Sequence, residues 1–359
     1  MEISNTALTP LSIIDILTLR YDLSIPPNLP KKSWNDFVSS NNPPNLDLIE
    51  NLISGEIHQK LEKFNTKKLS IALSGGVDST LILASIRKNY PDLDIEAISV
   101  KFANSVDETQ NAAKIAEKFE ANHHVIYVEN YLSELPRAIS QIKSPFWDLH
   151  WYFVAKKSST LSSVLASGDG GDEIFSGYTF RYKKFLSITN ENSTPLEKVK
   201  AYLSCHERDR VDDQELIFDQ KCKFSWKLIY DQLLPHFDNT LSRLEQVFLA
   251  DYNGKLLYNF NPINSRIATQ FDIQILAPLL NQDLISYGLK IQTKFKYDES
   301  SNVGKLPLRS LLKKYNVDSL ISKEKLGFNV NPINLWKSYG HSICKECRKS
   351  LRLLKKKEN

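Results

Sequence analysis

A six-residue stretch of this chain has the residue types and spacing of a phosphate-binding loop. It reads Ser74-Gly75-Gly76-Val77-Asp78-Ser79, follows a short apolar run and opens a segment with helical apolar spacing. Glycines without a Cβ atom let backbone N–H groups approach an anion, the serines add hydroxyl donors, and the helix that follows directs its positive end to the same place. The sequence therefore predicts a phosphate cradle between a strand and a helix.

The expected anion is the phosphate chain of ATP, bound together with Mg²⁺. The loop does not have the Gly-x-x-x-x-Gly-Lys-Ser/Thr pattern of the Walker type. Asp78 stands where a carboxylate would repel phosphate unless a cation lay between them, so a magnesium site is implied. The alternative is a Ser-Gly-Gly turn that binds no nucleotide, which is common after strands. The loop resembles that of the PP-loop ATP-pyrophosphatases, whose members adenylate a carbonyl or carboxyl oxygen and release pyrophosphate.

A second glycine-rich segment follows another expected strand. It reads Ser167-Gly168-Asp169-Gly170-Gly171-Asp172-Glu173-Ile174-Phe175-Ser176-Gly177-Tyr178. Glycines beside carboxylates suit neither a hydrophobic core nor a regular helix, so we expect a surface loop or a cleft. The segment resembles the Ser-Gly-Glu/Asp-Gly-x-Asp-Glu-Leu-Phe-x-Gly-Tyr signature of the asparagine synthetase family, in its synthetase domain. An acidic loop that binds only a structural cation is the alternative.

The resemblance implies a nucleotide site made from both segments. Asp172 would join Asp78 as a ligand of Mg²⁺, and Asp169 fills a position where the family carries Glu or Asp in support of acyl-adenylate formation. Val100 would lie near the adenine, where a backbone amide could bind the base. The expected nucleotide-binding residues are Leu73, Ser74, Gly75, Gly76, Asp78, Ser79, Val100, Ser167 and Gly168.

Lys325 is the expected catalytic lysine. The segment Lys323-Glu324-Lys325-Leu326-Gly327-Phe328 ends in the Lys-x-Gly-Phe pattern of the family. In that pattern the lysine is implied to stabilise negative charge during adenylation and on the tetrahedral intermediate, a role that suits a fixed ammonium in a dry cleft. Lys323 is the alternative if the register slips by two residues, and a solvated lysine pair is the other reading. Gly304–Leu312 resembles a Lys-x-x-Leu-Arg helix start of the same domain.

A third segment departs from the family pattern. Where the family has an Asp-Arg pair and then Glu-x-Arg-x-Pro-Phe-Leu-Asp, this chain has Ser265-Arg266 and then Gln274-Ile275-Leu276-Ala277-Pro278-Leu279-Leu280-Asn281. Gln274 in place of Glu removes a negative charge that could hold or deprotonate a cationic amine. The acyl substrate and the amine donor are therefore left open, and asparagine synthesis with them.

Strands and helices alternate between the two glycine-rich segments. This predicts an α/β fold in which a parallel sheet is sandwiched by helices, as in the adenine nucleotide alpha hydrolase-like PP-loop proteins, with both loops at the carboxyl ends of strands. The expected strands are residues 69–73, 95–100, 125–128 and 163–166, and the expected helices are 79–89, 107–121, 131–142 and 151–161.

The chain is expected to have three parts. Residues 1–45 would form an irregular, proline-containing N-terminal extension, and residues 46–190 would form the PP-loop ATP-pyrophosphatase subdomain, opened by a helix over 46–61. Residues 191–359 would form a mostly helical part that completes the synthetase domain, with helices over 241–260 and 283–291.

Composition favours a cytoplasmic enzyme. The chain has 359 residues, of which 42% are hydrophobic and 25% charged, enough for a substantial core. No stretch approaches the ~20 apolar residues of a membrane span, and the N-terminus has no secretory pattern. The four cysteines, which are expected to form neither a disulfide framework nor a complete zinc site, are Cys205, Cys222, Cys344 and Cys347.

Two further features concern partners. Lys345–Asn359 carries seven basic and two acidic residues, a local charge of +5 against +4 for the whole chain. Helical apolar spacing there favours a packed terminal helix over a nucleic-acid surface. Roughly 45 residues before the synthetase-like region are too few for a glutaminase domain. Nitrogen would therefore come from free ammonia, a separate glutaminase or an amine of the substrate itself.

The predicted function is that of an ATP-dependent, amide-forming ligase. It would adenylate a small-molecule carboxylate, release pyrophosphate and transfer an amine with release of AMP, as the resemblance to asparagine synthetases implies. One alternative is a PP-loop tRNA-modifying enzyme that uses the basic tail. The other is a nucleotide-binding protein that has lost amidation with the charges replaced at Gln274 and Leu276. His123 and His124 lead into an expected strand and are expected to pack there.

Overall fold

A computed structural model describes residues 9–37, 42–103, 107–130, 132–142, 149–206, 215, 218 and 223–321. The chain divides into two compact units, each made of separate stretches of sequence. The sheet unit comprises Ile53–Gly168, Ile263–Pro278 and Leu311–Asn359. The helical unit comprises Met1–Leu52, Asp169–Pro262 and Leu279–Ser310. The boundaries expected at residues 45 and 190 stay a prediction.

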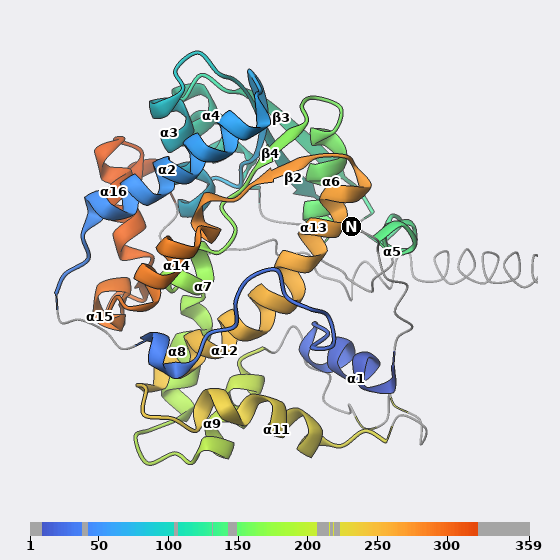
Figure 1. The fold of residues 1–359 in the computed structure, drawn as a ribbon, viewed down its shortest axis with the longest axis vertical. Helices are drawn as coiled ribbons and strands as arrows, with labels where there is room; N and C mark the ends of the chain where they lie inside the picture. Colours follow the sequence, from blue (N-terminus) through green and yellow to red (C-terminus); the bar gives the residue numbers. More distant parts are fainter. Residues whose placement is uncertain are drawn as a thin grey trace, which may run out of the picture. The chain divides into compact units, whose positions relative to one another are not determined.

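The sheet unit is built on a parallel sheet of five strands in the order β3-β2-β1-β4-β5 (Figure 1). All four neighbouring pairs are parallel. This confirms the fold class predicted from the sequence. The strands are β1 Lys68–Ala72, β2 Asp94–Phe102, β3 Asn122–Val128, β4 Val164–Ala166 and β5 Gln274–Leu276.

Helices cover both faces of this sheet because its central strands are apolar on both faces. Six consecutive residues of β2, 95–100, are buried. Helices α3 and α4 contact β1, β2 and β3, and α6 contacts β1, β2 and β4. The helices of the unit include α3 Val77–Asn89, α4 Thr109–Lys118, α5 Leu135–Ile142 and α6 Leu149–Ser158; α13 Asn261–Gln270 also packs on the sheet.

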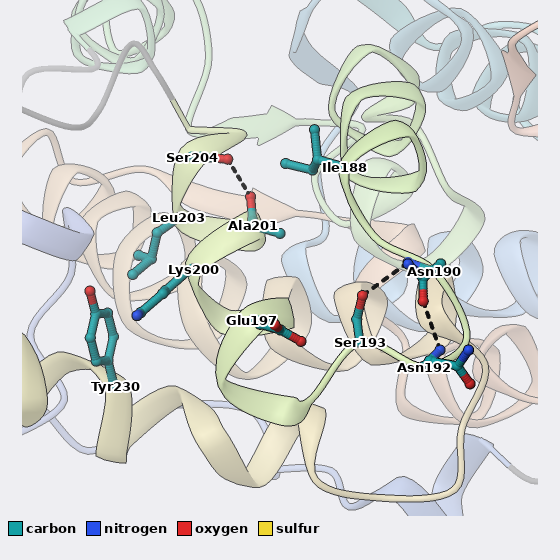
Figure 2. A pocket seen from close by; sticks show the side chains of 10 residues that line it. All are labelled: Ile188, Asn190, Asn192, Ser193, Glu197, Lys200, Ala201, Leu203, Ser204 and Tyr230. Atoms are coloured by element: carbon teal, nitrogen blue, oxygen red, sulfur yellow. Dashed lines mark hydrogen bonds between the residues drawn. The ribbon is translucent and has the colours of Figure 1, made fainter.

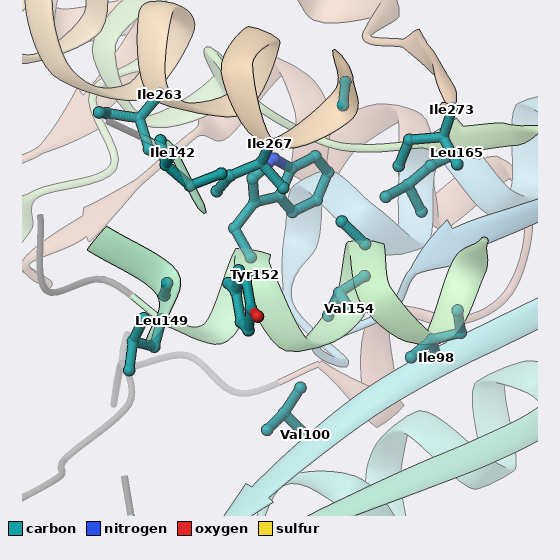
Figure 3. Close-up of a cluster of buried hydrophobic side chains, with 14 of the residues drawn as sticks. Ile98, Val100, Ile142, Leu149, Tyr152, Val154, Leu165, Ile263, Ile267 and Ile273 are labelled. Atoms are coloured by element: carbon teal, nitrogen blue, oxygen red, sulfur yellow. The ribbon is translucent and has the colours of Figure 1, made fainter. Parts of the chain in front are cut away.

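The core on one face lies between the sheet and the helices α6 and α13. Ile98 and Val100 of β2 meet Tyr152 of α6, and Ile263 and Ile267 of α13 close the cluster (Figure 3). All five side chains are less than a tenth exposed. The cluster includes residues of β2 and of β4, the two strands that flank β1. It therefore helps to fix the loops at the carboxyl ends of these strands.

The strand order reverses between β1 and β4. From β1 the chain runs outward through β2 to β3, whereas β4 and β5 lie on the other side of β1. In open parallel sheets, ligands bind outside the carboxyl ends of the strands at such a reversal. Both glycine-rich loops follow the two strands that meet there.

The helical unit contains short helices and one two-stranded hairpin, β6 Tyr297–Asp298 with β7 Val303–Gly304. The division between the units falls within the helices α2 Leu46–Phe64, α13 and α16 Leu306–Lys314, each of which contributes residues to both. The other described elements include α1 Pro10–Leu19, η1 Trp34–Phe37, α7 Gly171–Phe175, α8 Thr179–Ile188, α9 Pro195–Ser204, α11 Trp226–Phe237, α12 Arg243–Asp251, η2 Tyr252–Phe260, α14 Gln282–Leu289 and α15 Thr293–Lys296.

Two elements of the helical unit differ from the sequence expectation. Within the stretch expected to be irregular, residues 10–19 form α1, because Thr9 caps the helix through a bond from Ser12 N to Thr9 Oγ1 of 3.0 Å and Pro10 takes the first turn. The helix expected over 241–260 is α12 followed by the π-helical segment η2. Among the described residues, no helix is long and apolar enough to cross a membrane.

Candidate functional site

The first glycine loop leaves the carboxyl end of β1 and enters α3. Gly75 has a φ of +73°, a conformation that strongly favours glycine. A Cβ atom there would lie 3.3 Å from the backbone nitrogen of Ala112. The loop is therefore packed closely against the first turn of α4, which fixes the direction of its backbone.

Hydroxyl groups hold the loop in shape. The Oγ atoms of Ser74 and Ser79 lie 3.2 Å apart, and the N–H of Ser74 donates to Ser79 Oγ at 3.2 Å. Gly76, the N-cap of α3, donates its N–H to Ser74 Oγ at 3.3 Å and has no side chain to cap the helix. The first turn of a helix of 13 residues thus directs its N–H groups to a place that suits an anion.

The second glycine segment touches the first loop at Gly168. Its predecessor Ser167 donates its N–H to Leu276 O at 2.9 Å, which joins the end of β4 to the end of β5. A Cβ atom on Gly168 would lie 2.6 Å from Asp78 Cβ and 2.8 Å from Ser79 N. Only glycine leaves room for the two loops to meet here, and their contact lies at the strand reversal.

Val100, the residue expected to contact the base, lies near the carboxyl end of β2. Leu73 donates its N–H to Ile98 O at 2.9 Å, so Ile98 directs its backbone groups toward β1. The backbone N–H and C=O groups of successive residues in a strand point to opposite neighbouring strands, so those of Val100, two residues after Ile98, also point to the β1 side. Val100 lies beyond Ala72, the last residue of β1 that is paired with β2. Val100 is buried, with 9% of its surface exposed.

The two histidines serve the sheet. His123 Nε2 lies 2.8 Å from Ser99 Oγ, and Ser99 Oγ donates to Leu73 O at 2.6 Å. Burial lowers the pKa of His123. His124 Nε2 lies 2.5 Å from a carboxylate oxygen of Glu96. Both side chains therefore tie strands together, as the sequence analysis expects.

The carboxylates of the second segment belong to the helical unit. Gly170, with a φ of +93°, is the N-cap of α7, and Asp169 precedes it. Asp169 and Asp172 are half-buried. Glu173 is buried and accepts a hydrogen bond of 2.5 Å from the hydroxyl of Tyr178. Burial and the Glu173 charge hold the pKa of Tyr178 well above its usual value, so the hydroxyl stays a donor.

Asp172 forms an ion pair that the sequence analysis does not foresee. Lys305 Nζ lies 2.6 Å from Asp172 Oδ1, and the two side chains are 10% and 20% exposed. A Cβ atom on Gly177 would lie 1.8 Å from Asp172 Oδ1 and 2.3 Å from Lys305 Cε. The helix-start pattern at Gly304–Leu312 contains this lysine, and it is the one sequence signal that could have singled it out.

The residues described fit Mg²⁺-ATP in their chemistry. The serine hydroxyls and the start of α3, next to Gly168, suit phosphate oxygens. Asp78 lies in the first turn of α3 and offers the kind of hard oxygen ligand that Mg²⁺ prefers, and Mg²⁺ commonly takes one or two carboxylates plus phosphate oxygens and water. Within the described ranges, no group of three or more His, Cys, Asp or Glu could hold a metal ion.

Gln274 lies at the opposite end of β5 from the glycine-rich loops. It is the exposed first residue of β5 and pairs with Val164, the first residue of β4. The last residue of β5, Leu276, accepts the hydrogen bond from Ser167. Lys325, Lys323, three of the cysteines and the basic tail lie outside the described residues. Cys205 is buried.

A surface pocket in the helical unit contains none of the expected site residues. It lies between the end of α8, helix α9 and Tyr230 of α11 (Figure 2). Its polar groups are used locally: Ser193 Oγ accepts from Asn190 N at 3.0 Å, and Glu197 accepts from Thr194 N at 2.7 Å. Lys200 Nζ lies 5.6 Å from the centre of the Tyr230 ring. The pocket is therefore a poor candidate for the active site.

The parallel sheet, with glycine-rich loops at its strand reversal, defines an open α/β protein. The chain belongs to the asparagine synthase family, whose model matches residues 62–358. The family resemblance read from the sequence motifs is thereby confirmed.

Curated relatives carry the names of asparagine synthetases. Asparagine synthetase [glutamine-hydrolyzing] 1 of Bacillus subtilis (strain 168) is 25% identical over 299 residues, which cover 74% of this chain and 46% of that protein. The asparagine synthetase [glutamine-hydrolyzing] of Rattus norvegicus is 26% identical over 131 residues, 33% of this chain and 23% of that protein. The aligned region thus spans less than half the length of either relative.

A solved structure of NMN synthetase from Francisella tularensis is also similar. It has 15% sequence identity and a TM-score of 0.32, and the match covers 61% of this chain and 99% of that one.

Proposed function

We propose that this chain is an ATP-dependent ligase that converts a carboxylate into an acyl-adenylate and then an amide. Pyrophosphate leaves in the first step and AMP in the second. Family membership supports the class of reaction. The observation that carries the proposal is the contact of Gly168 with Asp78 and Ser79, because it joins both motif loops into one cradle at the strand reversal.

In this proposal the cradle binds ATP. Ser74, Gly75, Gly76 and Ser79 hold the phosphates through backbone N–H groups and hydroxyls, supported by the Ser74–Ser79 hydroxyl contact and the open start of α3. The nucleoside lies against backbone groups at the carboxyl ends of the strands. Those residues are Leu73, Val100, Ser167 and Gly168.

The acidic residues have two roles. Asp78 and Asp172 each offer a carboxylate to Mg²⁺, which when bound neutralises phosphate charge so that a substrate carboxylate can attack the α-phosphorus. Asp169 supports formation of the acyl-adenylate, a role taken from its match to the family signature. Lys325 stabilises negative charge in both steps, on the strength of its Lys-x-Gly-Phe context.

The acyl substrate and the source of the amine each have more than one candidate. The relatives' names favour aspartate as the acyl substrate, with the amine supplied as ammonia directly or by a separate glutaminase. The replacement of Glu by Gln274 favours instead a substrate whose amine differs from the family standard. An amine carried by the acyl substrate itself is the third source.

The test is product analysis with purified full-length protein. Mg²⁺-ATP and ammonia are incubated with individual amino acids or a metabolite extract, and AMP and pyrophosphate are followed by mass spectrometry. We expect substrate-dependent AMP that falls at least a hundredfold in Asp78→Ala and Lys325→Ala, roughly the loss typical for a group that stabilises transition-state charge. Asp92→Ala, an exposed aspartate of the same unit, is the matched control and should keep full activity.

Each other outcome has a defined meaning. AMP formed with aspartate alone would assign asparagine synthesis despite Gln274. ADP in place of AMP would overturn the adenylation chemistry. Tight ATP binding with no AMP for any substrate would leave a nucleotide-binding protein, and AMP only when tRNA is present would favour the tRNA-modifying alternative.

A further inference from the structure

The Lys305–Asp172 ion pair joins a proposed metal ligand to a cation that the chain itself supplies. The ammonium nitrogen lies 2.6 Å from Asp172 Oδ1, a short charge-assisted contact. Both side chains are largely shielded from water, with 10% and 20% exposed, so solvent screens their attraction less than at an open surface. In the structure described, the carboxylate is thus already neutralised.

The backbone around Lys305 is held in place for this contact. Lys305 has a φ of +59°, an uncommon conformation for a residue with a side chain. Its N–H donates to Phe175 O at 3.0 Å, and its carbonyl accepts from Arg309 N at 2.9 Å. Phe175 is the last residue of α7, the helix that carries Asp172. Two hydrogen bonds therefore fix the lysine to the acidic helix and to the first turn of α16.

Two glycines make room for the pair. At Gly304 a Cβ atom would lie 2.0 Å from Ser176 O, so the chain before Lys305 runs directly against the end of α7. At Gly177 a Cβ atom would overlap both Asp172 Oδ1, at 1.8 Å, and Lys305 Cε, at 2.3 Å. The close approach of the chain at Gly177 and at Gly304 therefore leaves room for the ion pair only because both residues are glycines.

We propose that Lys305 is a resident counter-cation of Asp172, which a divalent cation must displace in order to bind. The ammonium and a divalent cation would compete for the same carboxylate, and their mutual repulsion disfavours a shared oxygen. The four-carbon stem of lysine allows the ammonium to move away while the anchored backbone stays in place. Lys305 is therefore a positioning residue that sets how strongly Asp172 attracts the metal, and this inference rests on the role of Asp172 in the proposed function.

Loss of Lys305 should affect cation binding differently from loss of a residue that only holds a metal ligand in place. Removing the ammonium leaves a half-buried carboxylate without this counter-charge, and such a carboxylate attracts a cation more strongly. Loss of Lys305 should thus tighten the binding of a divalent cation, whereas loss of a supporting residue weakens it.

The first test measures Mn²⁺ binding to the full chain by electron paramagnetic resonance of the free ion, with and without ATP. We expect Lys305→Met to lower the Mn²⁺ dissociation constant by roughly tenfold, within the range of coupling between close charge pairs. Lys305→Arg should stay near the wild-type value because the charge is kept. Lys183→Met, on an exposed lysine of the same unit, is the matched control and should not change it. Unchanged or weaker binding in a folded Lys305→Met variant overturns the inference.

The second test uses the unaltered protein and so does not depend on a variant that folds. Acetylation of Lys305 by a limiting amount of acetic anhydride is followed by mass spectrometry before and after addition of Mg²⁺-ATP, with Lys183 as the internal standard. Displacement predicts a several-fold rise in labelling of Lys305 alone. No rise overturns the inference.

Failure of this inference is distinct from failure of the proposed function. AMP formation by the wild type together with unchanged Mn²⁺ affinity in Lys305→Met overturns the counter-cation role alone. Unchanged Mn²⁺ affinity in Asp172→Asn removes Asp172 as a metal ligand and overturns the inference with it, while the ATP-binding role of the sheet-unit loops is tested separately by AMP formation.

Discussion

Arg181 and Asp251 form a buried ion pair, with Arg181 Nη1 2.9 Å from Asp251 Oδ1 and side chains only 4% and 1% exposed. Tyr202 donates its hydroxyl to the same carboxylate oxygen at 2.8 Å. The guanidinium lies 3.9 Å from the centre of the Tyr178 ring, and the Tyr178 hydroxyl donates to Glu173. The last residue of the acidic signature is thereby linked to a charged cluster in the interior of the helical unit.

This linkage predicts that Arg181→Met strongly destabilises the protein. The variant leaves the Asp251 charge buried without its main partner, which typically costs about 3–5 kcal/mol in the free energy of unfolding. The double variant Arg181→Met/Asp251→Leu should recover part of the loss because no uncompensated charge remains. Urea unfolding of the full chain measures both.

A surface pair of the same unit provides the control. Lys227 Nζ lies 2.7 Å from Asp231 Oδ2, with side chains 77% and 52% exposed. Lys227→Met should change the free energy of unfolding by less than about 0.5 kcal/mol. A loss in Arg181→Met no larger than in this control would contradict the role assigned to the buried pair.

Gly168→Ala is predicted to impair ATP binding while leaving the fold intact. The new Cβ atom would lie 2.6 Å from Asp78 Cβ and 2.8 Å from Ser79 N, so the two loops must separate. Because the loops are proposed to share the phosphates, we expect the dissociation constant of Mg²⁺-ATP to rise by roughly tenfold or more, on the scale of other strained core positions. Isothermal titration calorimetry measures the change.

Gly55→Ala is the matched control for that substitution. Gly55 lies inside α2, and nothing lies within 4 Å of a Cβ atom added there. Alanine in a helix interior is favoured over glycine by about 1 kcal/mol, so this variant should be slightly more stable and bind ATP normally. Equal ATP affinity in Gly168→Ala and the wild type would argue against a shared cradle.

The parts of the fold that the sequence predicted are those with a strong local signal. Strand β1 was expected over 69–73 and occupies 68–72, since an apolar run of this length before a glycine turn has few other uses. Strand β5 was not expected, because Gln274–Leu276 is too short to show a period and becomes a strand by pairing with β4. The prolines near the N-terminus suggested irregular chain, although Pro10 starts α1.

The candidate site was predictable to the extent that its residues lie in continuous motifs. Gly168 could be named as a site residue, but its contact with Asp78 depends on β1 and β4 being neighbours, which no local pattern encodes. Lys305 could not be paired with Asp172, because a long-range ion pair leaves no spacing to detect. The motifs thus predict the chemistry, whereas only the tertiary structure shows which residues contact each other.

From the raised pKa of Asp15 we expect the protein to lose stability as the pH rises from acid toward neutral. Burial raises the pKa of this carboxyl from 3.8 to about 6, opposed by a hydrogen bond from Gln232 Nε2 of 3.0 Å. A group whose pKa is raised by folding stabilises the protein below its unfolded pKa, and this contribution is lost as the pH rises through the folded pKa. The window is therefore about pH 4 to 6.

Asp15→Asn should remove this pH dependence. The amide oxygen can still accept from Gln232, and no charge has to be buried. At pH 7 we expect a gain of up to roughly 3 kcal/mol in the free energy of unfolding, from the relation of about 1.4 kcal/mol per pKa unit. At pH 3.5 the variant and the wild type should be nearly equal. A constant difference across this range would show that the effect does not arise from ionisation.

From the lowered pKa of Lys296 we expect the opposite trend at alkaline pH, where stability should increase as the pH rises. Its side chain is fully buried, donates to Gly288 O at 3.2 Å and lies 5.0 Å from the centre of the Phe248 ring. Burial lowers the pKa of this amine from 10.5 to about 8, so the charged form is disfavoured in the folded state. The cost is complete below about pH 8 and is relieved as the pH rises toward 10.5, where stability should increase.

Lys296→Met tests this reading because methionine fills similar space without a charge. At pH 7 the variant should gain up to roughly 3 kcal/mol over the wild type, less the hydrogen bond to Gly288, and the gain should shrink steadily between pH 8 and 10. Urea midpoints at several pH values measure it, with Lys183→Met as the exposed control that should show no such trend. A methionine variant less stable than the wild type at pH 7 would mean that the Lys296 ammonium, despite its burial, is needed for the packing of the helical unit.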